Sequence, residues 1–331
     1  MSNLRDIASK AGVAVSTASL AINGDARVKP ATRQRVLDAA RDLNYYPSRA
    51  ARSLSSGRTW SLHLFNLLSD SGLSSSFFTH FVRGIHDVVY SHSYTLALTV
   101  LENEIEAKAT LTRLIRERWT DGVILMNVSA EESLLDALLV HEFPHVLLGH
   151  SERAGVWSVD NDNEAVARDA TRHLLERGRY PVLFLNGPTQ HTFVQERARG
   201  YRQAHAECGT PSQALLQFGL GSAHEARERI GTLLREGLEF RSVLAASDAV
   251  AVGALRGLRD ASLRVPEDVA VVGMNNDDLT DYTDPPLTSV ELNPSELGRE
   301  AARLLLASIE GGLPERRLVP HGLVVRDSSG R

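Results

Sequence analysis

The stretch LRDIASKAGVAVSTASLAING, residues 4–24, sets the architecture of the N-terminal part of the chain. Over residues 4–11 apolar side chains recur at i, i+3, i+4 and i+7, which is the spacing of one face of a helix. Gly12 ends this helix, and after a three-residue turn the pattern repeats over 15–22 until the Asn-Gly pair at 23–24. Helix, short turn and helix at this spacing predict a helix-turn-helix unit.

A third helix and a basic charge extend this unit. The helix is expected after Pro30, with an inward-facing apolar stripe of Val36, Leu37, Ala40 and Leu43. The first 58 residues hold ten Lys and Arg against four Asp and Glu, a net charge of +6, whereas the other 273 residues carry 26 against 37, a net charge of −11. A basic head on an acidic body is typical of a nucleic-acid-binding module joined to a domain that does not bind nucleic acid.

The segment YYPSRAARSLSSGRT, residues 45–59, follows the head. Its proline stops the preceding helix, and a very short helical stretch with small or basic exposed residues comes after it. A helix this short is unstable by itself, so we expect it to form only against a partner surface.

Length and composition bound the class of protein. The 331 residues, with 43% hydrophobic and 23% charged side chains, indicate a globular chain of two or three folding units. We expect a cytoplasmic protein without contact to a membrane, because no signal segment and no long apolar run is present. The single cysteine, Cys208, excludes an intrachain disulfide and a cysteine-rich zinc site. No motif of a hydrolase, a nucleotide-binding loop or a metalloenzyme occurs, so we predict no enzymatic activity, no cofactor and no metal.

From residue 60 onward apolar runs alternate with helical patterns. The expected strands are 61–68, 94–101, 122–128, 145–149, 181–186, 214–218, 243–246 and 269–273. The expected helices are 77–91, 106–118, 162–177, 195–208, 222–236 and 249–260. This alternation predicts parallel sheets with helices on both faces. Two sheets are favoured over a single (β/α)₈ barrel, because residues 288–325 form a strand, a helix and a strand that can return to both sheets.

Residues 4–59 resemble the head of the lac repressor (LacI/GalR) family of transcriptional regulators. The match consists of DIA (6–8), AGV (11–13), Thr17, Ser19, Asn23 and AARSL (50–54). The resemblance implies that the second helix lies in the major groove of DNA and that the hinge helices of two protomers enter the minor groove together. Leu54 is then a wedge at the central base step, with Ala51 against the groove floor; the alternative for Leu54 is a buried linker residue. The residues expected at DNA are Val15, Ser16, Thr17, Ser19, Leu20, Asn23, Ser48, Ala51, Arg52 and Leu54.

Two head residues depart from the family pattern. Leu20 stands where the family commonly has Arg or another polar residue, and leucine offers a base only an apolar contact. Ala14 replaces the usual serine and removes a hydroxyl that can bind a phosphate. The docking geometry survives both changes, but the operator sequence of relatives does not transfer to this chain.

The resemblance extends over the rest of the chain, which looks like a type I periplasmic-binding-protein fold. Its longest matching motifs are LRVPEDVAVVG (263–273) and DPPLTSV (284–290). We therefore expect a helix-turn-helix domain at 1–46, a hinge at 47–59 and an effector-binding and dimerisation domain at 60–331. Within the last domain the expected parts are an N-lobe at about 61–160, a C-lobe at about 161–290 and a tail, 291–331, that recrosses between them.

The carboxyl ends of the strands are where ligands of open α/β sheets bind. Arg197 matches the family's ligand arginine, and its planar fork suits vicinal hydroxyls or a carboxylate. Asn275 stands where many relatives have aspartate, which removes one negative charge. The residues expected at the effector are Phe77, Phe78, Asp160, His191, Phe193, Arg197, Leu220, Asp248 and Asn275. Three of these keep another interpretation: Phe77 as core, Asp160 as a cap of the helix near 162, and His191 as a surface residue. Asn161, next to Asp160, has the same two interpretations, a helix cap or a ligand contact.

These features together predict a DNA-binding transcriptional regulator, a repressor rather than an activator, that works as a homodimer on a pseudo-palindromic operator and responds to a small molecule. A sugar or sugar derivative is the first choice of effector, and a nucleoside or another metabolite is the second. A solute-binding protein without a regulatory role is the alternative from another class; the basic head and the lack of an export signal disfavour it.

Overall fold

The computed structural model describes residues 2–45, 53, 56–67, 75–101, 103–127, 133–210 and 215–330. They form two compact units, Met1–Trp60 and Ser61–Arg331, called here the head and the body. Four residues expected at DNA, Ser48, Ala51, Arg52 and Leu54, lie outside the described residues.

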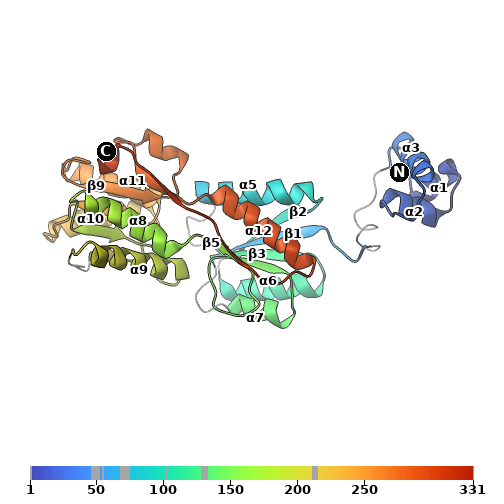
Figure 1. Cartoon of the computed structure of the whole chain (residues 1–331), viewed down its shortest axis with the longest axis horizontal. Coiled ribbons are helices and arrows are strands. Elements are labelled where there is room, and N and C mark those ends of the chain that lie inside the picture. Colours follow the sequence, from blue (N-terminus) through green and yellow to red (C-terminus); the bar gives the residue numbers. More distant parts are fainter. Residues whose placement is uncertain are drawn as a thin grey trace. The chain divides into compact units, whose positions relative to one another are not determined.

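The head contains helices α1 (Leu4–Ala11), α2 (Val15–Ile22) and α3 (Pro30–Asp42) in its described part (Figure 1). Asn3 begins α1 with a capping box: its side chain accepts from the N–H of Asp6, and the carboxylate of Asp6 accepts from the N–H of Asn3. Gly12 ends α1 in the left-handed conformation, with φ 64°. The helix-turn-helix arrangement expected from the sequence is confirmed.

The head core is built almost entirely from small residues. Its buried members are Ile7, Ala8, Ala11, Ala18, Ala21, Val28, Val36, Ala39 and Ala40. The expectation that Leu37 belongs to the inner stripe of α3 is wrong, because Leu37 is 38% exposed and Ala39 takes the inward position. Alanine at the crossings lets three short helices pack closely, which leaves no room for a leucine there.

The body has two lobes, each with one sheet. The N-lobe sheet has the order β2-β1-β3-β4-β5-β11 and is parallel throughout. Its strands are β1 (Ser61–Leu67), β2 (Thr95–Leu101), β3 (Gly122–Met126), β4 (His145–Leu148), β5 (Ser158–Asp160) and β11 (Arg316–Leu318). Its helices are α5 (Ser76–Ser91), α6 (Glu104–Arg116), α7 (Ser133–Val140) and α12 (Pro294–Ile309).

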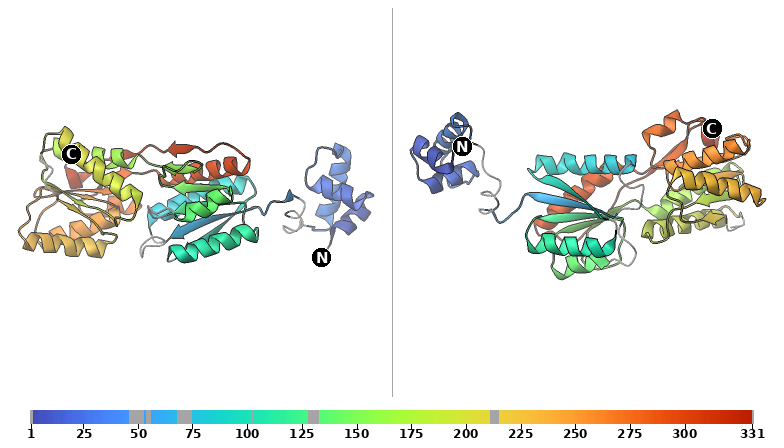
Figure 2. Two further views of the ribbon diagram at one scale, coloured as in Figure 1. Left: turned by 90° about the horizontal axis from the view of Figure 1, so that it is seen from below. Right: turned by 180° about the vertical axis from the view of Figure 1, so that it is seen from behind.

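The C-lobe sheet has the order β7-β6-β8-β9-β10-β12 and is parallel except for β12, which runs antiparallel to β10. Its strands are β6 (Val182–Leu185), β7 (Leu216–Gln217), β8 (Ser242–Ala245), β9 (Ala270–Met274), β10 (Thr288–Glu291) and β12 (Gly322–Val324). Its helices are α8 (Asn163–Glu176), α9 (Thr192–Glu207), α10 (Ala223–Arg235) and α11 (Asp248–Asp260), with the 3₁₀ turns η1 (Asp278–Tyr282) and η2 (Asp327–Ser329). Figure 2 shows helices on both faces of each sheet.

Two open sheets confirm the two-lobed α/β body and exclude the barrel. In the described residues the backbone passes between the lobes after β5, after β10 and after β11 (Figure 2). The tail is therefore divided, since α12 and β11 belong to the N-lobe and β12 to the C-lobe. The sequence did not indicate β5, which has three residues, or α7, whose sequence SLLDALLV is apolar on nearly every side.

Helices α5 and α12 cross at a pair of glycines. A side-chain carbon at Gly84 would overlap the carbonyl oxygen of Ser295, and one at Gly298 would overlap that of Phe81. The two backbones therefore touch directly, and neither can yield without moving a whole helix. This crossing fixes α5, whose first turn forms part of the cavity described below.

We predict that Gly298→Ala lowers the stability of the body by about 1 to 3 kcal/mol, because the added methyl group meets backbone and not a flexible side chain. Thermal unfolding followed by circular dichroism measures the effect. Gly231→Ala in α10 is the matched control: nothing lies within 4 Å of its added carbon, and helix propensity predicts a gain of about 0.5 to 1 kcal/mol. Equal midpoints for the two variants would contradict the backbone contact.

Candidate functional site

Helix α2 of the head exposes the residues expected to read DNA. Val15 is 42% exposed at its start, Ser16 and Asn23 are exposed, and Thr17 and Ser19 are half-buried. Leu20 is also half-buried and packs against the head core, which gives leucine a structural role at this position.

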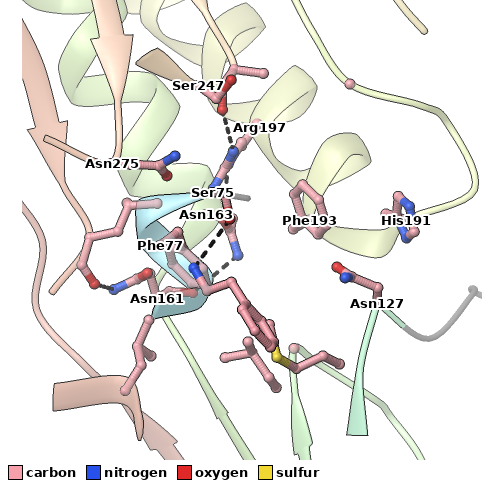
Figure 3. A pocket seen from close by; sticks show the side chains of 18 of the residues that line it. Ser75, Phe77, Asn127, Asn161, Asn163, His191, Phe193, Arg197, Ser247 and Asn275 are labelled. Atoms are coloured by element: carbon pink, nitrogen blue, oxygen red, sulfur yellow. Dashed lines mark hydrogen bonds between the residues drawn. The ribbon is translucent and has the colours of Figure 1, made fainter. Parts of the chain in front are cut away.

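A cavity of about 480 Å³ lies between the lobes of the body, at the carboxyl ends of the strands. The N-lobe contributes the first turn of α5 and the residues that follow β3, β4 and β5. The C-lobe contributes the first turns of α9 and the residues that follow β8 and β9. Figure 3 shows Phe77, Asn127, Phe193 and Arg197 arranged around this space.

The structure places eight of the nine residues expected at the effector in the cavity wall. They are Phe77, Phe78, Asp160, His191, Phe193, Arg197, Leu220 and Asn275. Asp160 does not cap a helix, because α8 is capped by Asp162, whose side chain accepts from the N–H of Ala165 at 2.9 Å.

Asp248 is the exception, and the expectation that it accepts effector hydroxyls is wrong. Its side chain is completely buried and does not line the cavity. Its carboxylate accepts from Ser289 Oγ at 2.6 Å and from the N–H of Asp277 at 2.8 Å. It lies against Gly273, where a side chain would occupy the same space. Asp248 therefore supports a neighbouring loop.

Arg197 is held in one orientation by three neighbours. Its Nε donates to Asn163 Oδ1 at 3.0 Å, and its Nη1 donates to the carbonyl of Ala246 at 3.2 Å. Its guanidinium carbon lies 5.0 Å from the centre of the Phe193 ring, and the residue is 7% exposed (Figure 3). Contacts within the protein thus hold the fork in a single orientation.

Carboxyl groups surround this arginine. Burial and, to a smaller extent, the nearby Glu196 raise the pKa of Asp160 to about 7. Burial also raises the pKa of Glu196 and lowers that of Arg197 to about 10, so the guanidinium stays protonated at neutral pH. Among the described lining residues Arg197 is the only Lys or Arg. The cavity therefore offers directed hydrogen bonds without an excess of positive charge.

Sequence reasoning missed Asn127 and Asn163, and it left Asn161 between a helix cap and a ligand contact. Asn127 donates to Asn66 Oδ1 at 2.8 Å, and Asn163 donates to Asp160 Oδ1 at 3.0 Å, behind Arg197. Nδ2 of Asn161 donates to the carbonyls of Leu292 and Val319 at 3.1 and 2.8 Å. Asn127 and Asn161 come directly after the last residue of β3 and of β5, and that position was the available signal.

Neither a membrane-spanning helix nor a metal site is found in the part of the chain that the structure describes. None of its helices is long and apolar enough to cross a bilayer. Its His, Cys, Asp and Glu side chains form no group of three or more that could hold a metal ion.

Two family models match this chain, one in the head and one in the body. Residues 3–48 match the model of bacterial regulatory proteins of the lacI family, and residues 171–329 match that of a periplasmic binding protein-like domain. The chain is 31% identical over 325 residues to the HTH-type transcriptional repressor PurR of Aliivibrio fischeri (strain MJ11), covering 96% of this chain and 95% of PurR. It is 33% identical over 333 residues to the HTH-type transcriptional regulator CelR of Thermobifida fusca, covering 98% and 97%.

Two solved structures agree with the fold over the full length. The complex of the transcriptional regulator CelR with cellobiose has a TM-score of 0.77 at 31% identity and covers 99% of this chain and 100% of that one. The lac repressor dimer bound to operator and the anti-inducer ONPF has a TM-score of 0.88 at 23% identity, covering 100% and 99%. PurR and CelR are named as transcriptional regulators, which agrees with the prediction that the chain is not an enzyme. The helix-turn-helix head, the two-lobed body and these relatives together show that the chain belongs to the LacI family of DNA-binding transcriptional regulators.

Proposed function

We propose that this regulator is a cytoplasmic repressor whose homodimer binds a pseudo-palindromic operator and whose effector is an uncharged polyhydroxylated molecule, a sugar or sugar derivative, held between the lobes. The observation that carries this proposal is the fixed fork of Arg197, set among asparagine side chains in the interlobe cavity.

The cavity wall supplies what a sugar needs. The arginine fork donates to hydroxyl groups, the side-chain amides donate and accept, and the ring of Phe77 offers a flat apolar face to a sugar ring. The volume of about 480 Å³ lies within the usual range for small-molecule sites. CelR, with 31% identity, is solved as its complex with cellobiose, which supports a sugar for this chain as well.

The charges in the wall favour an uncharged effector over an anionic one. Asp160 and Glu196 lie close enough to Arg197 to oppose the effect of burial on its pKa, so they offset part of its positive charge. A sugar acid or a nucleotide would bring a further negative charge near Asp277, which also lines the cavity. A nucleoside is the second candidate, because His191 stacks on Phe193 with ring centres 5.4 Å apart and presents a planar surface for a base.

In this proposal the head and the hinge bind the operator. Val15 and Ser16 at the exposed start of α2 contact base edges in the major groove. Segment 47–59 acts as the hinge, and Leu54 enters the minor groove beside its counterpart from the second protomer. An effector that changes the relation of the two lobes then favours or disfavours the hinge helix.

We predict that an uncharged sugar, with cellobiose included in the screen, raises the thermal midpoint of the full chain by about 5 °C at a hundredfold excess over its Kd. Arg197→Ala removes this shift, because the variant lacks the fixed fork, while the affinity for the operator in the absence of sugar stays unchanged. Differential scanning fluorimetry against sugars, sugar acids and nucleosides measures the first effect. A shift with sugar acids alone, or the same sugar shift in Arg197→Ala, would sink the proposed effector site.

We predict that Leu54→Ala lowers the affinity for the operator at least tenfold and leaves nonspecific DNA binding unchanged, since the wedge acts only at the central base step. Mobility shifts with operator and random fragments at several salt concentrations measure both affinities. The slope of affinity against salt should stay the same, because no charge is lost. Leu37→Ala, the same change at an exposed position of α3, is the control. An equal loss on both kinds of DNA would refute the wedge.

A further inference from the structure

We propose that Ser76 and Asp277 form a latch between the lobes and that Asp277 is a positioning residue that couples effector binding to lobe closure. The coupling rests on the proposed function, since it requires an effector between the lobes. The latch itself joins two residues of the chain and is tested in the absence of effector.

The latch is a hydrogen bond between two cavity-lining residues from opposite lobes. Ser76 is the first residue of α5 in the N-lobe, and its Oγ donates to Oδ1 of Asp277. Asp277 follows β9 in the C-lobe and precedes η1. Figure 1 shows α5 beginning at the side of the N-lobe that faces the C-lobe. Opening the cavity separates these two elements and breaks the bond.

The loop that carries Asp277 is held firmly on the C-lobe side. The N–H of Asp277 donates to the buried Asp248 at 2.8 Å, and its carbonyl accepts from Thr280 Oγ1 at 2.7 Å. The N–H of Asn276 donates to Ser289 Oγ at 3.0 Å, and Arg326 Nη1 donates to Asn276 Oδ1 at 2.9 Å. These contacts fix the backbone of Asp277 on the C-lobe, so the loop does not follow Ser76 when the lobes separate.

Backbone strain in the same loop points to a functional position. Asn275 and Asn276 have φ values of 111° and 52°, two successive residues in a region that residues other than glycine rarely adopt. Such conformations persist only where the surroundings impose them, and they concentrate at binding and switch sites. Here they turn the chain so that Asn275 lines the cavity and Asp277 reaches α5.

The two carboxylate oxygens of Asp277 can hold Ser76 and bind the effector at the same time. Oδ1 holds Ser76, whereas Oδ2 has no hydrogen-bond partner among the residues that the structure describes. Because Asp277 lines the cavity, Oδ2 is available to a hydroxyl group of the effector. An effector that binds the carboxylate favours the closed arrangement, and a closed latch keeps the carboxylate in place for the effector.

We predict that Ser76→Ala and Asp277→Ala each shift the effector-free full chain toward open lobes, lowering the ratio of closed to open forms about tenfold, which is typical for the loss of a hydrogen bond to a charged group. Spin labels on the native, exposed Cys208 in the C-lobe and on Val140→Cys, 78% exposed in the N-lobe, report the lobe separation. Double electron–electron resonance gives the distance distribution. An excess of unlabelled Cys208→Ser chain in the mixture restricts the signal to distances within one protomer.

The double variant separates a direct bond from two unrelated effects. If Ser76 and Asp277 interact, combining the substitutions opens the lobes no further than either one alone. Asp277→Asn keeps an accepting oxygen and should restore most of the closed form without disturbing the loop. Thr79→Ala on α5 and Asp278→Ala are matched controls at exposed neighbouring positions, and both should retain the parental distribution.

Two results would overturn the latch: distributions of the single variants that superimpose on the parent, or effects of the two substitutions that add. Both outcomes are independent of the effector, so a failed sugar screen rejects the proposed effector and leaves this test intact. When a sugar does bind, Asp277→Ala should weaken it about tenfold or more through the combined loss of latch and acceptor, and Thr79→Ala should leave its affinity unchanged.

Discussion

The side-chain amide of Asn161 joins the segments that connect the two lobes, and the body depends on this junction. Asn161 lies just after β5, and its Nδ2 donates to Leu292, after β10, and to Val319, after β11. Asn161 is 4% exposed, so an aliphatic side chain there would leave two carbonyl groups without this donor in a dry environment. The amide thus keeps the connections together at the axis about which the lobes can move, and the cavity opens beside that axis.

The crossing of α5 and α12 in the N-lobe links the connecting segments to the cavity wall. Helix α12 enters the N-lobe after the second connection and packs on α5 through Gly84 and Gly298, backbone against backbone. The first turn of α5 supplies Phe77 and Phe78 to the cavity. The position of these rings is therefore set by a contact between glycines that no ligand touches. Rigid packing behind a site is what allows small changes at the site to be transmitted as movement of whole elements.

The parts of the molecule that follow from local pattern could be predicted from the sequence. The head, the alternation of strands and helices, and most cavity residues follow from periodicity, turn residues and the family motifs. What could not be predicted depends on tertiary contacts. Asp248 has the residue type and strand-end position of a ligand residue. Its carboxylate is buried instead, because Gly273 has no side chain to fill that space and Ser289 donates a hydrogen bond to it. Leu37 fits the helical stripe of α3, yet close packing of alanines excludes it.

The polar groups of the cavity also determine its selectivity among similar effectors. Nearby carboxyl groups offset part of the charge of Arg197, and net charge does not separate one uncharged ligand from another. Arg197 and the asparagines are instead fixed donors and acceptors with few alternative partners. A ligand that lacks one matching hydroxyl leaves such a group buried and unsatisfied, which costs about 1 to 3 kcal/mol, a factor of about 5 to 150 in affinity. A site of this kind distinguishes stereoisomers of a sugar by the positions of their hydroxyl groups, and the coupling through Asp277 extends the same selection to lobe closure.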